Sequence, residues 1–132
     1  MANKLKPLYS ALQRAHSKIL EAMSFPETEP MREATIRWFE YTFELSWKLM
    51  GAILADQSIE AYGAKTVIRE AGRLGLIPEV SIWLGFAEAR NKTSHIYKES
   101  VAIEVHKVIK NGSCQAVADL VEKSQKFCSW KC

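Results

Sequence analysis

The spacing of the apolar residues is the feature that most constrains the fold of this chain. Between its proline- and glycine-containing segments, apolar side chains recur every three or four positions and not every two. A spacing of three and four places side chains on one face of an α-helix, whereas a spacing of two is typical of a β-strand. The pattern therefore predicts an all-α fold.

The segment that follows Pro30 carries two apolar stripes on opposite sides. The first stripe consists of Ile36, Phe39, Phe43, Trp47, Met50 and Leu54, and the second of Trp38, Tyr41, Leu45, Leu49 and Ala52. A helix that is apolar on two faces is expected to be buried on both. One face would meet the core, and the other either a second copy of the chain or the rest of the same bundle. Thr28 or Glu29 is a suitable N-terminal cap for this helix. Pro30 is tolerated in its first turn.

The other helical segments each have a single apolar face. The first has Leu5, Leu8, Leu12, Ala15, Ile19 and Met23 on one stripe and ends before Pro26, while His16 beside the stripe is expected to be structural. The third ends at Gly75, which suits a left-handed C-terminal residue. The fourth is expected to begin at Pro78, and Ser100 is the candidate cap of the fifth. Residues 111–112, Asn-Gly, break or kink the chain before a last helix at about residues 114–127.

The composition indicates an ordinary globular domain. The chain has 132 residues, of which 48% are apolar and 25% charged, and this length suits one domain over residues 1–132. It has no apolar run near 20 residues and no signal-peptide pattern, so we expect a cytoplasmic protein with no membrane contact. The net charge of +3 is compatible with a phosphate-bearing partner but does not argue for one.

The cysteines predict neither a disulfide framework nor a metal site. Cys114, Cys128 and Cys132 are odd in number and contain no C-x-x-C pair. No histidine stands at zinc-ligand spacing beside them. We therefore expect reduced thiols, no metal and no cofactor.

One eight-residue stretch concentrates groups that carry chemistry. It reads Arg90-Asn91-Lys92-Thr93-Ser94-His95-Ile96-Tyr97. On one continuous helix, Arg90 and His95 would point about 140° apart. Either the helix ends near Ser94, or another element or a second copy completes the site. An arginine in line with an apolar stripe is also costly unless it pairs with a carboxylate or faces a solvent-filled cleft. Glu40 and Glu44 border the first stripe, and either is able to neutralise Arg90, with Glu44 the first choice.

These groups suffice for cleavage of RNA without a metal. Arg90 is suited to bind a phosphate and stabilise charge that develops on it, and His95 is suited to move a proton at a 2′-hydroxyl or a leaving oxygen. The 2′-oxygen would attack the adjacent phosphorus and leave a 2′,3′-cyclic phosphate, while Asn91 orients the histidine ring. In the alternative interpretation, Arg90 makes a structural ion pair and His95 is a solvated residue at a helix end.

Basic side chains elsewhere are candidates for contact with an RNA backbone. Lys65, Arg69 and Arg73 lie at a spacing of four on the third segment, and Lys92 lies within the motif. Such a row is able to follow a phosphate backbone. It is also the pattern of a solvated helix face, so both interpretations stay open.

Three blocks of the sequence resemble one protein family. Arg90-x4-His95-x-Tyr97 resembles the R-x4-H-x-Y motif of HEPN-domain proteins. Residues 39–48, FEYTFELSWK, and residues 67–77, with VIREA and LGLI, are similar to the signature stretches of the HepT branch, also called nucleotidyltransferase substrate-binding proteins. The resemblance covers roughly residues 31–104.

The resemblance implies an up-and-down antiparallel bundle of four to five helices that forms a homodimer. The two motifs would face a shared cleft, with Arg90 and His95 catalytic and Asn91 and Ser94 supporting. A minimal nucleotidyltransferase would be the partner and antitoxin of an RNase toxin, and in some members it adds AMP to the motif tyrosine, here Tyr97.

The resemblance also leaves a second interpretation and two departures. The chain would alternatively be a non-catalytic subunit that presents a nucleotide or substrate to the nucleotidyltransferase. Lys92 stands where the family often has an apolar residue, and the cysteine-bearing tail has no known family role.

Overall fold

Every regular element between residues 2 and 127, the part of the chain that the computed structural model describes, is helical. The elements are α1 (Ala2–Met23), α2 (Glu29–Asp56), α3 (Ala64–Leu74), α4 (Val80–Lys92), η1 (Thr93–His95), α5 (Glu99–Lys110), α6 (Ser113–Ser124) and η2 (Gln125–Phe127), where η marks a 3-10 helix. The predicted all-α class is confirmed. The described residues contain six α-helices, one for each helical segment predicted from the sequence, against four to five in the bundle that the resemblance implies. Gly112 at φ 105° separates α5 from α6, where the sequence allowed a break or a kink.

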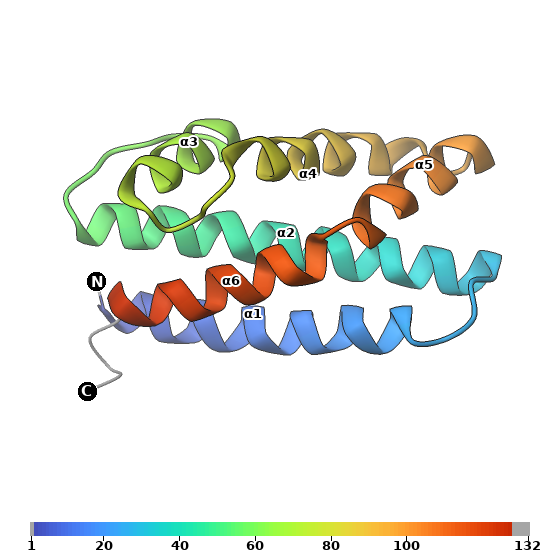
Figure 1. The fold of residues 1–132 in the computed structure, drawn as a ribbon, viewed down its shortest axis with the longest axis horizontal. Coiled ribbons are helices and arrows are strands. Elements are labelled where there is room, and N and C mark those ends of the chain that lie inside the picture. The colour runs from blue at the N-terminus through green and yellow to red at the C-terminus, as the bar shows by residue number, and fades with distance from the viewer. Residues whose placement is uncertain (1, 128–132) are drawn as a thin grey trace.

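Helix α2 is the centre of the bundle. It runs antiparallel to α1 and also contacts α3, α4, α5 and α6 (Figure 1). Its first predicted stripe faces the core, although Trp47 is only half-buried. On the second stripe Leu49 is fully buried, whereas Trp38 and Leu45 are half-buried and Tyr41 is 46% exposed. The bundle thus covers the second face only in part.

Local sequence signals set several helix ends. The amide of Met31 donates a hydrogen bond to Thr28 Oγ1 at 3.3 Å, so Thr28 and not Glu29 caps α2. Gly75 ends α3 in the left-handed conformation at φ 84°, and the Leu76 amide donates to the Ala71 carbonyl at 2.9 Å. Both assignments follow from residues next to the helix end.

Two predicted helix starts differ from the structure. Helix α4 begins at Val80 and not at Pro78, because Glu79 before it has extended backbone at φ −132° and ψ 105°. Helix α5 begins at Glu99, so the prediction of Ser100 as its cap is wrong. The Lys98 amide donates to the His95 carbonyl at 3.1 Å, and this turn leads into the helix before Ser100 is reached.

Aromatic packing fixes α4 against α2. Trp83 and Phe86 on α4 are at most 2% exposed, and their ring centroids lie 5.2 Å apart in an edge-to-face arrangement. Phe86 meets Phe39 at 6.2 Å, and Trp83 meets Phe43 at 6.5 Å. Rings of this size bury large apolar areas and prefer such angles. This layer sets the position of the residues that follow on α4, including Arg90.

Close packing also joins α3 to the start of α4. A Cβ atom added to Gly72 would overlap the Cγ2 atom of Val80. A larger residue at this position would require the Val80 side chain to shift, so the glycine suits the close approach of the two helices.

The isolated histidine His16, on α1, contacts Cys114 on α6. His16 Nε2 is hydrogen-bonded to the Cys114 carbonyl oxygen at 3.0 Å, so the structural role predicted for His16 is confirmed. The Cys114 thiol is half-buried, and this burial raises its pKa. Cys128, Cys132 and the rest of the predicted tail lie outside the described residues. None of the described helices is both long and apolar enough to span a membrane.

Candidate active site at the end of helix α4

The motif begins on an α-helix and leaves it. Helix α4 ends at Lys92, and Thr93, Ser94 and His95 form one turn of 3-10 helix before the chain enters α5. Of the alternatives raised by the 140° angle, the structure therefore shows the helix ending close to Ser94. A tighter turn changes the direction in which His95 points relative to Arg90.

Arg90 is held by α2 and by the 3-10 turn. Its Nη1 donates to Thr93 Oγ1 at 3.0 Å and lies 3.5 Å from Glu40 Oε2. The Thr93 hydroxyl in turn lies 2.9 Å from Glu40 Oε2, to which it donates. Thr93 is 5% exposed, whereas the side chains of Arg90 and Glu40 are 36% and 27% exposed. The guanidinium is thus fixed at the edge of the bundle and still reaches solvent.

The carboxylate partner of Arg90 is Glu40, so the choice of Glu44 is wrong. Glu44 accepts a hydrogen bond from Trp47 Nε1 at 3.3 Å and pairs with Lys48 at 3.7 Å. Glu40 lies one helical turn earlier on α2, and the crossing of α4 over α2 brings Arg90 to that turn. Sequence spacing alone does not tell which of two such carboxylates faces another helix.

The second half of the motif is open to solvent. His95 is exposed and Tyr97 is 76% exposed, and their ring centroids lie 6.1 Å apart at an angle of 69°. Asn91 and Ser94 are exposed as well, and Ser94 Oγ donates to the Asn91 carbonyl at 3.4 Å. Within residues 2–127, no hydrogen bond joins His95 to Asn91 or to Arg90, so the orienting role of Asn91 stays a prediction.

Most of the basic side chains that are candidates for RNA contact already form ion pairs with acidic side chains. Lys65 lies 3.5 Å from Glu88, Arg73 2.8 Å from Glu70, and Lys92 2.7 Å from Glu104. Arg69 is exposed, and no salt bridge to it is found among the described residues. These are exposed pairs of the kind that contribute little to stability.

Thr93 is a residue of this candidate site that the sequence-based prediction missed. It lies three positions after Arg90, a spacing at which two helical side chains meet. That spacing was a usable signal, but the buried contact with Glu40 depends on α2. Glu40 also lies near Arg37, whose pKa is raised by a hydrogen bond with Tyr41 and by the charges of Tyr41 and Glu40.

Comparison with known proteins identifies the family of this chain. A family model described as nucleotidyltransferase substrate binding protein like matches residues 3–126. The chain belongs to this family. It is also 41% identical over 76 residues to the Haemophilus influenzae protein named probable ribonuclease HepT, a match that covers 54% of this chain and 52% of that one. The chain thus matches about half the length of this curated relative.

Solved structures agree with this assignment. A Thermus thermophilus protein superposes with a TM-score of 0.72 at 29% identity, covering 87% of this chain and 96% of the other. A Haemophilus influenzae protein, described as having the fold of a substrate binding domain of a nucleotidyltransferase, gives 0.68 at 28% identity, covering 95% and 99%. The resemblance of the sequence to the HepT-like branch of the HEPN proteins is confirmed.

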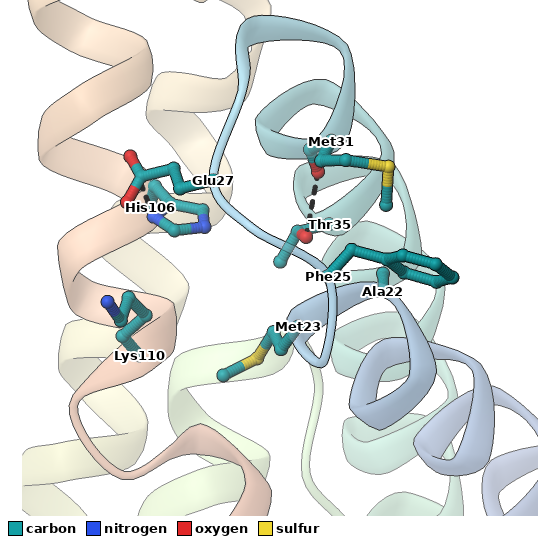
Figure 2. Close-up of a pocket in the computed structure, with 8 residues that line it drawn as sticks. All are labelled: Ala22, Met23, Phe25, Glu27, Met31, Thr35, His106 and Lys110. Carbon is teal, nitrogen blue, oxygen red and sulfur yellow. Dashed lines mark hydrogen bonds and ion pairs between the residues drawn. The ribbon is translucent and has the colours of Figure 1, made fainter.

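A second polar site in this family member lies at the other end of α5 from the motif. A cavity of about 90 Å³ opens between the α1–α2 loop and α5 (Figure 2). It is lined by Ala22, Met23, Phe25, Glu27, Met31, Thr35, His106 and Lys110. His106 is 6% exposed, and its Nδ1 lies 3.6 Å from Glu27 Oε2, which also accepts from Arg32 Nε at 3.1 Å. The sequence analysis did not single out this histidine.

The two partners in this cavity have shifted pKa values. Burial lowers the pKa of His106, against the attraction of Glu27, and the charges of Lys110 and Arg32 lower it further. The hydrogen bond from Arg32 lowers the pKa of the Glu27 carboxyl. Among residues 2–127, no group of three or more histidine, cysteine or acidic side chains is arranged to bind a metal ion.

Proposed function

We propose that this chain is a metal-independent endoribonuclease toxin of a HEPN–nucleotidyltransferase pair. The observation that carries the proposal is the fixed guanidinium of Arg90 at the bundle surface, followed five residues later by the exposed imidazole of His95. The similarity to a protein named probable ribonuclease HepT supports it. An arginine is suited to bind the phosphate in an internal transfer on RNA, and a histidine is suited to move the proton.

The reaction divides between these two residues. His95 accepts the proton of a 2′-hydroxyl, and the 2′-oxygen forms a bond to the adjacent phosphorus. Arg90 stabilises the negative charge on the non-bridging phosphate oxygens as the transition state forms. The bond from phosphorus to the 5′-oxygen breaks, and that oxygen takes up a proton. The products are a 2′,3′-cyclic phosphate and a 5′-hydroxyl.

Cleavage by purified protein tests this proposal. We expect wild-type protein to cleave RNA in the presence of EDTA and to leave 2′,3′-cyclic phosphate ends. His95→Ala should lower the rate at least about 100-fold, and Arg90→Lys should also lower it, because an ammonium does not offer paired donors to a phosphate. Lys98→Ala, at an exposed position next to the motif, is the control. A His95→Ala protein that cleaves at the wild-type rate would disprove the catalytic assignment.

The proposal includes a homodimer formed through the partly open face of α2. Trp38, Tyr41 and Leu45 line a groove of about 600 Å³ between α1 and α2, with Arg14 and Glu44 also on its walls. A surface that carries both charge signs beside an apolar centre is able to pair with a copy of itself. A second copy would supply a second histidine, which suits the proton needed at the leaving oxygen.

The oligomeric state in solution tests the groove. We expect light scattering to report a dimer for the wild type and a monomer for Tyr41→Asp, because a charge at the centre of an apolar interface is not solvated. Tyr62→Asp is the matched control, since Tyr62 is 80% exposed and lies on the α2–α3 loop. A Tyr41→Asp protein that remains dimeric would place the interface elsewhere.

Tyr97 is the proposed site at which a partner nucleotidyltransferase silences the toxin. Its phenol is exposed beside His95, so an enzyme has access to it. The phenolic oxygen would attack the α-phosphorus of ATP and release pyrophosphate, leaving AMP on the tyrosine. The added phosphodiester would carry a negative charge into a site that binds RNA phosphate.

Intact mass tests this step. Co-expression with a minimal nucleotidyltransferase should add one or more AMP groups and abolish cleavage. Tyr97→Phe should stay unmodified and active, whereas Tyr62→Phe, at the other highly exposed tyrosine, should be modified like the wild type. Modification that persists in Tyr97→Phe would contradict the assignment.

Basic residues outside the motif are proposed to contact the RNA backbone. Arg69 is suited to this role without losing an ion pair, whereas Lys65, Arg73 and Lys92 would first leave their acidic partners. Each lost phosphate contact should reduce the salt dependence of RNA binding by about one unit of slope. We therefore expect Arg69→Ala to have the largest effect of the four.

The second candidate function is a non-catalytic subunit that presents substrate to a nucleotidyltransferase. The family description and the similarity to a Haemophilus influenzae substrate binding domain favour it. It predicts no RNA cleavage by the lone protein, with His95→Ala indistinguishable from the wild type, together with a stable complex with the nucleotidyltransferase. Failure to bind either a nucleotide or that partner would exclude it.

A further inference from the structure

The Thr93 hydroxyl acts as a link between Arg90 and α2. It accepts a hydrogen bond from Arg90 Nη1 at 3.0 Å, and its single proton reaches Glu40 Oε2 at 2.9 Å or the Arg90 carbonyl oxygen at 2.7 Å. A hydroxyl both accepts and donates, which an apolar side chain of the same shape does not. At 5% exposure, Thr93 makes these bonds away from bulk water, where they are electrostatically stronger.

The bonds leave one part of the guanidinium free for a ligand. Nη1 is engaged by Thr93 and Glu40, and Nε is buried with no hydrogen-bond partner among the described residues. The side chain of Arg90 is nevertheless 36% exposed. Nη2 is therefore the nitrogen that a phosphate oxygen meets first, and its direction is set by the bonds on the opposite side.

The carboxylate of Glu40 has a cost for phosphate binding that a positioning role explains. A carboxylate beside a phosphate-binding arginine repels the phosphate and so weakens its binding. Through its contacts with Arg90 Nη1 and the Thr93 hydroxyl, the carboxylate instead fixes where the guanidinium stands. Orientation that is established before the substrate binds lowers the barrier of the chemical step more than it improves binding.

We propose that Thr93 and Glu40 are positioning residues, which hold the guanidinium of Arg90 so that Nη2 faces the scissile phosphate of an RNA. This inference rests on the proposed ribonuclease activity, and it assigns roles to two residues outside the arginine, histidine and tyrosine of the motif. Neither residue touches the reacting atoms; both act through Arg90.

Hydroxyl removal at Thr93 is the first test. Thr93→Val keeps the shape of the side chain and removes both hydrogen bonds, whereas Thr93→Ser keeps the hydroxyl. We expect kcat for RNA cleavage to fall about 10- to 100-fold in Thr93→Val with KM changed less than about threefold, and Thr93→Ser to restore most of the rate. Thr66→Val, at an exposed position on α3, is the matched control and should cleave like the wild type.

Charge removal at Glu40 provides a second readout. Glu40→Gln keeps an oxygen acceptor but removes the negative charge that opposes the phosphate. We expect a lower kcat together with a lower KM, a pair of changes that loss of folded protein does not produce. The NMR signal of the Arg90 Nε–H group should also show faster rotation of the guanidinium in Thr93→Val and Glu40→Gln than in the wild type.

The outcomes separate this inference from the function on which it rests. Wild-type cleavage that is unchanged in both Thr93→Val and Glu40→Gln would overturn the positioning roles and leave the ribonuclease standing. No cleavage by the wild type would overturn both. Thermal unfolding of each variant identifies any rate loss that comes from unfolded protein, and the Ser variant and the KM of Glu40→Gln then decide.

Discussion

The two halves of the motif are built in opposite ways. Arg90 and Thr93 are bonded to each other and to Glu40 on α2, and Thr93 is almost completely buried. His95 and Tyr97, only a few residues later, are exposed and lie against each other. The first half is held by the fold, while the second is open to whatever binds there. A phosphate-binding group gains from a fixed position, whereas a group that must meet RNA or a modifying enzyme needs access.

The difference has its origin in what lies beneath each half. Under Arg90, the rings of Trp83 and Phe86 pack on Phe39 and Phe43 of α2 and fix α4. After Lys92, the chain changes to a 3-10 turn in which Ser94 and His95 are exposed, and Ile96 after the turn makes a half-buried contact with the core. The same eight residues therefore pass from a rigid support to a surface turn.

The largest expected effect is on the support of the first half. Trp83→Ala should lower the free energy of unfolding by about 3–5 kcal/mol, because it leaves a large cavity between α4 and α2. Urea unfolding followed by circular dichroism measures this loss. A loss of less than about 1 kcal/mol would mean that α4 is held by something other than its aromatic layer, and the contrast between the halves would weaken.

The next effect concerns the polar link itself. Thr93→Val should lower the free energy of unfolding by about 1–2 kcal/mol, because Glu40 and Arg90 lose a buried hydrogen-bond partner. The partial exposure of Arg90 keeps the effect at this size. A double-mutant cycle of Thr93→Val with Glu40→Gln, again by urea unfolding, should show that the two losses are not additive. Additive losses would contradict a shared network.

A smaller effect should distinguish the buried histidine from the motif. The folded-state pKa of His106 is lowered, so the unfolded chain takes up this proton first as the pH falls. Stability should therefore decrease as the pH falls through the unfolded value of about 6.5. In His106→Gln, unfolding measured between about pH 7.5 and 5.5 should depend less steeply on pH. An equal slope in wild type and variant would show that this histidine does not link pH to stability.

The smallest expected effect on stability is in the second half. His95→Ala and Tyr97→Ala should each change the free energy of unfolding by less than about 0.5 kcal/mol, since both side chains are exposed. His95→Ala should nevertheless abolish the proposed cleavage, so activity and stability would separate at this position. A loss of more than about 1 kcal/mol from either change would show that the second half also supports the fold.

Local sequence determined the helices and several of their ends. The spacing of apolar residues, the Thr28 cap and the left-handed Gly75 all depend on neighbours within a few positions. The eight-residue motif was visible for the same reason, since it is contiguous. The family resemblance read from these blocks was confirmed over residues 3–126. Each of these properties depends on residues that are close together in the sequence, so the sequence is enough to predict them.

The contacts between helices were decided by the tertiary structure. The choice of Glu40 over Glu44, the role of Thr93 and the pairing of Lys92 with Glu104 each depend on how one helix crosses or faces another. The contact of His106 with Glu27 likewise joins two residues that are 79 positions apart in the sequence. A shift of one helical turn moves a charge by about 5 Å, which is enough to exchange its partner, and apolar periodicity does not fix that shift.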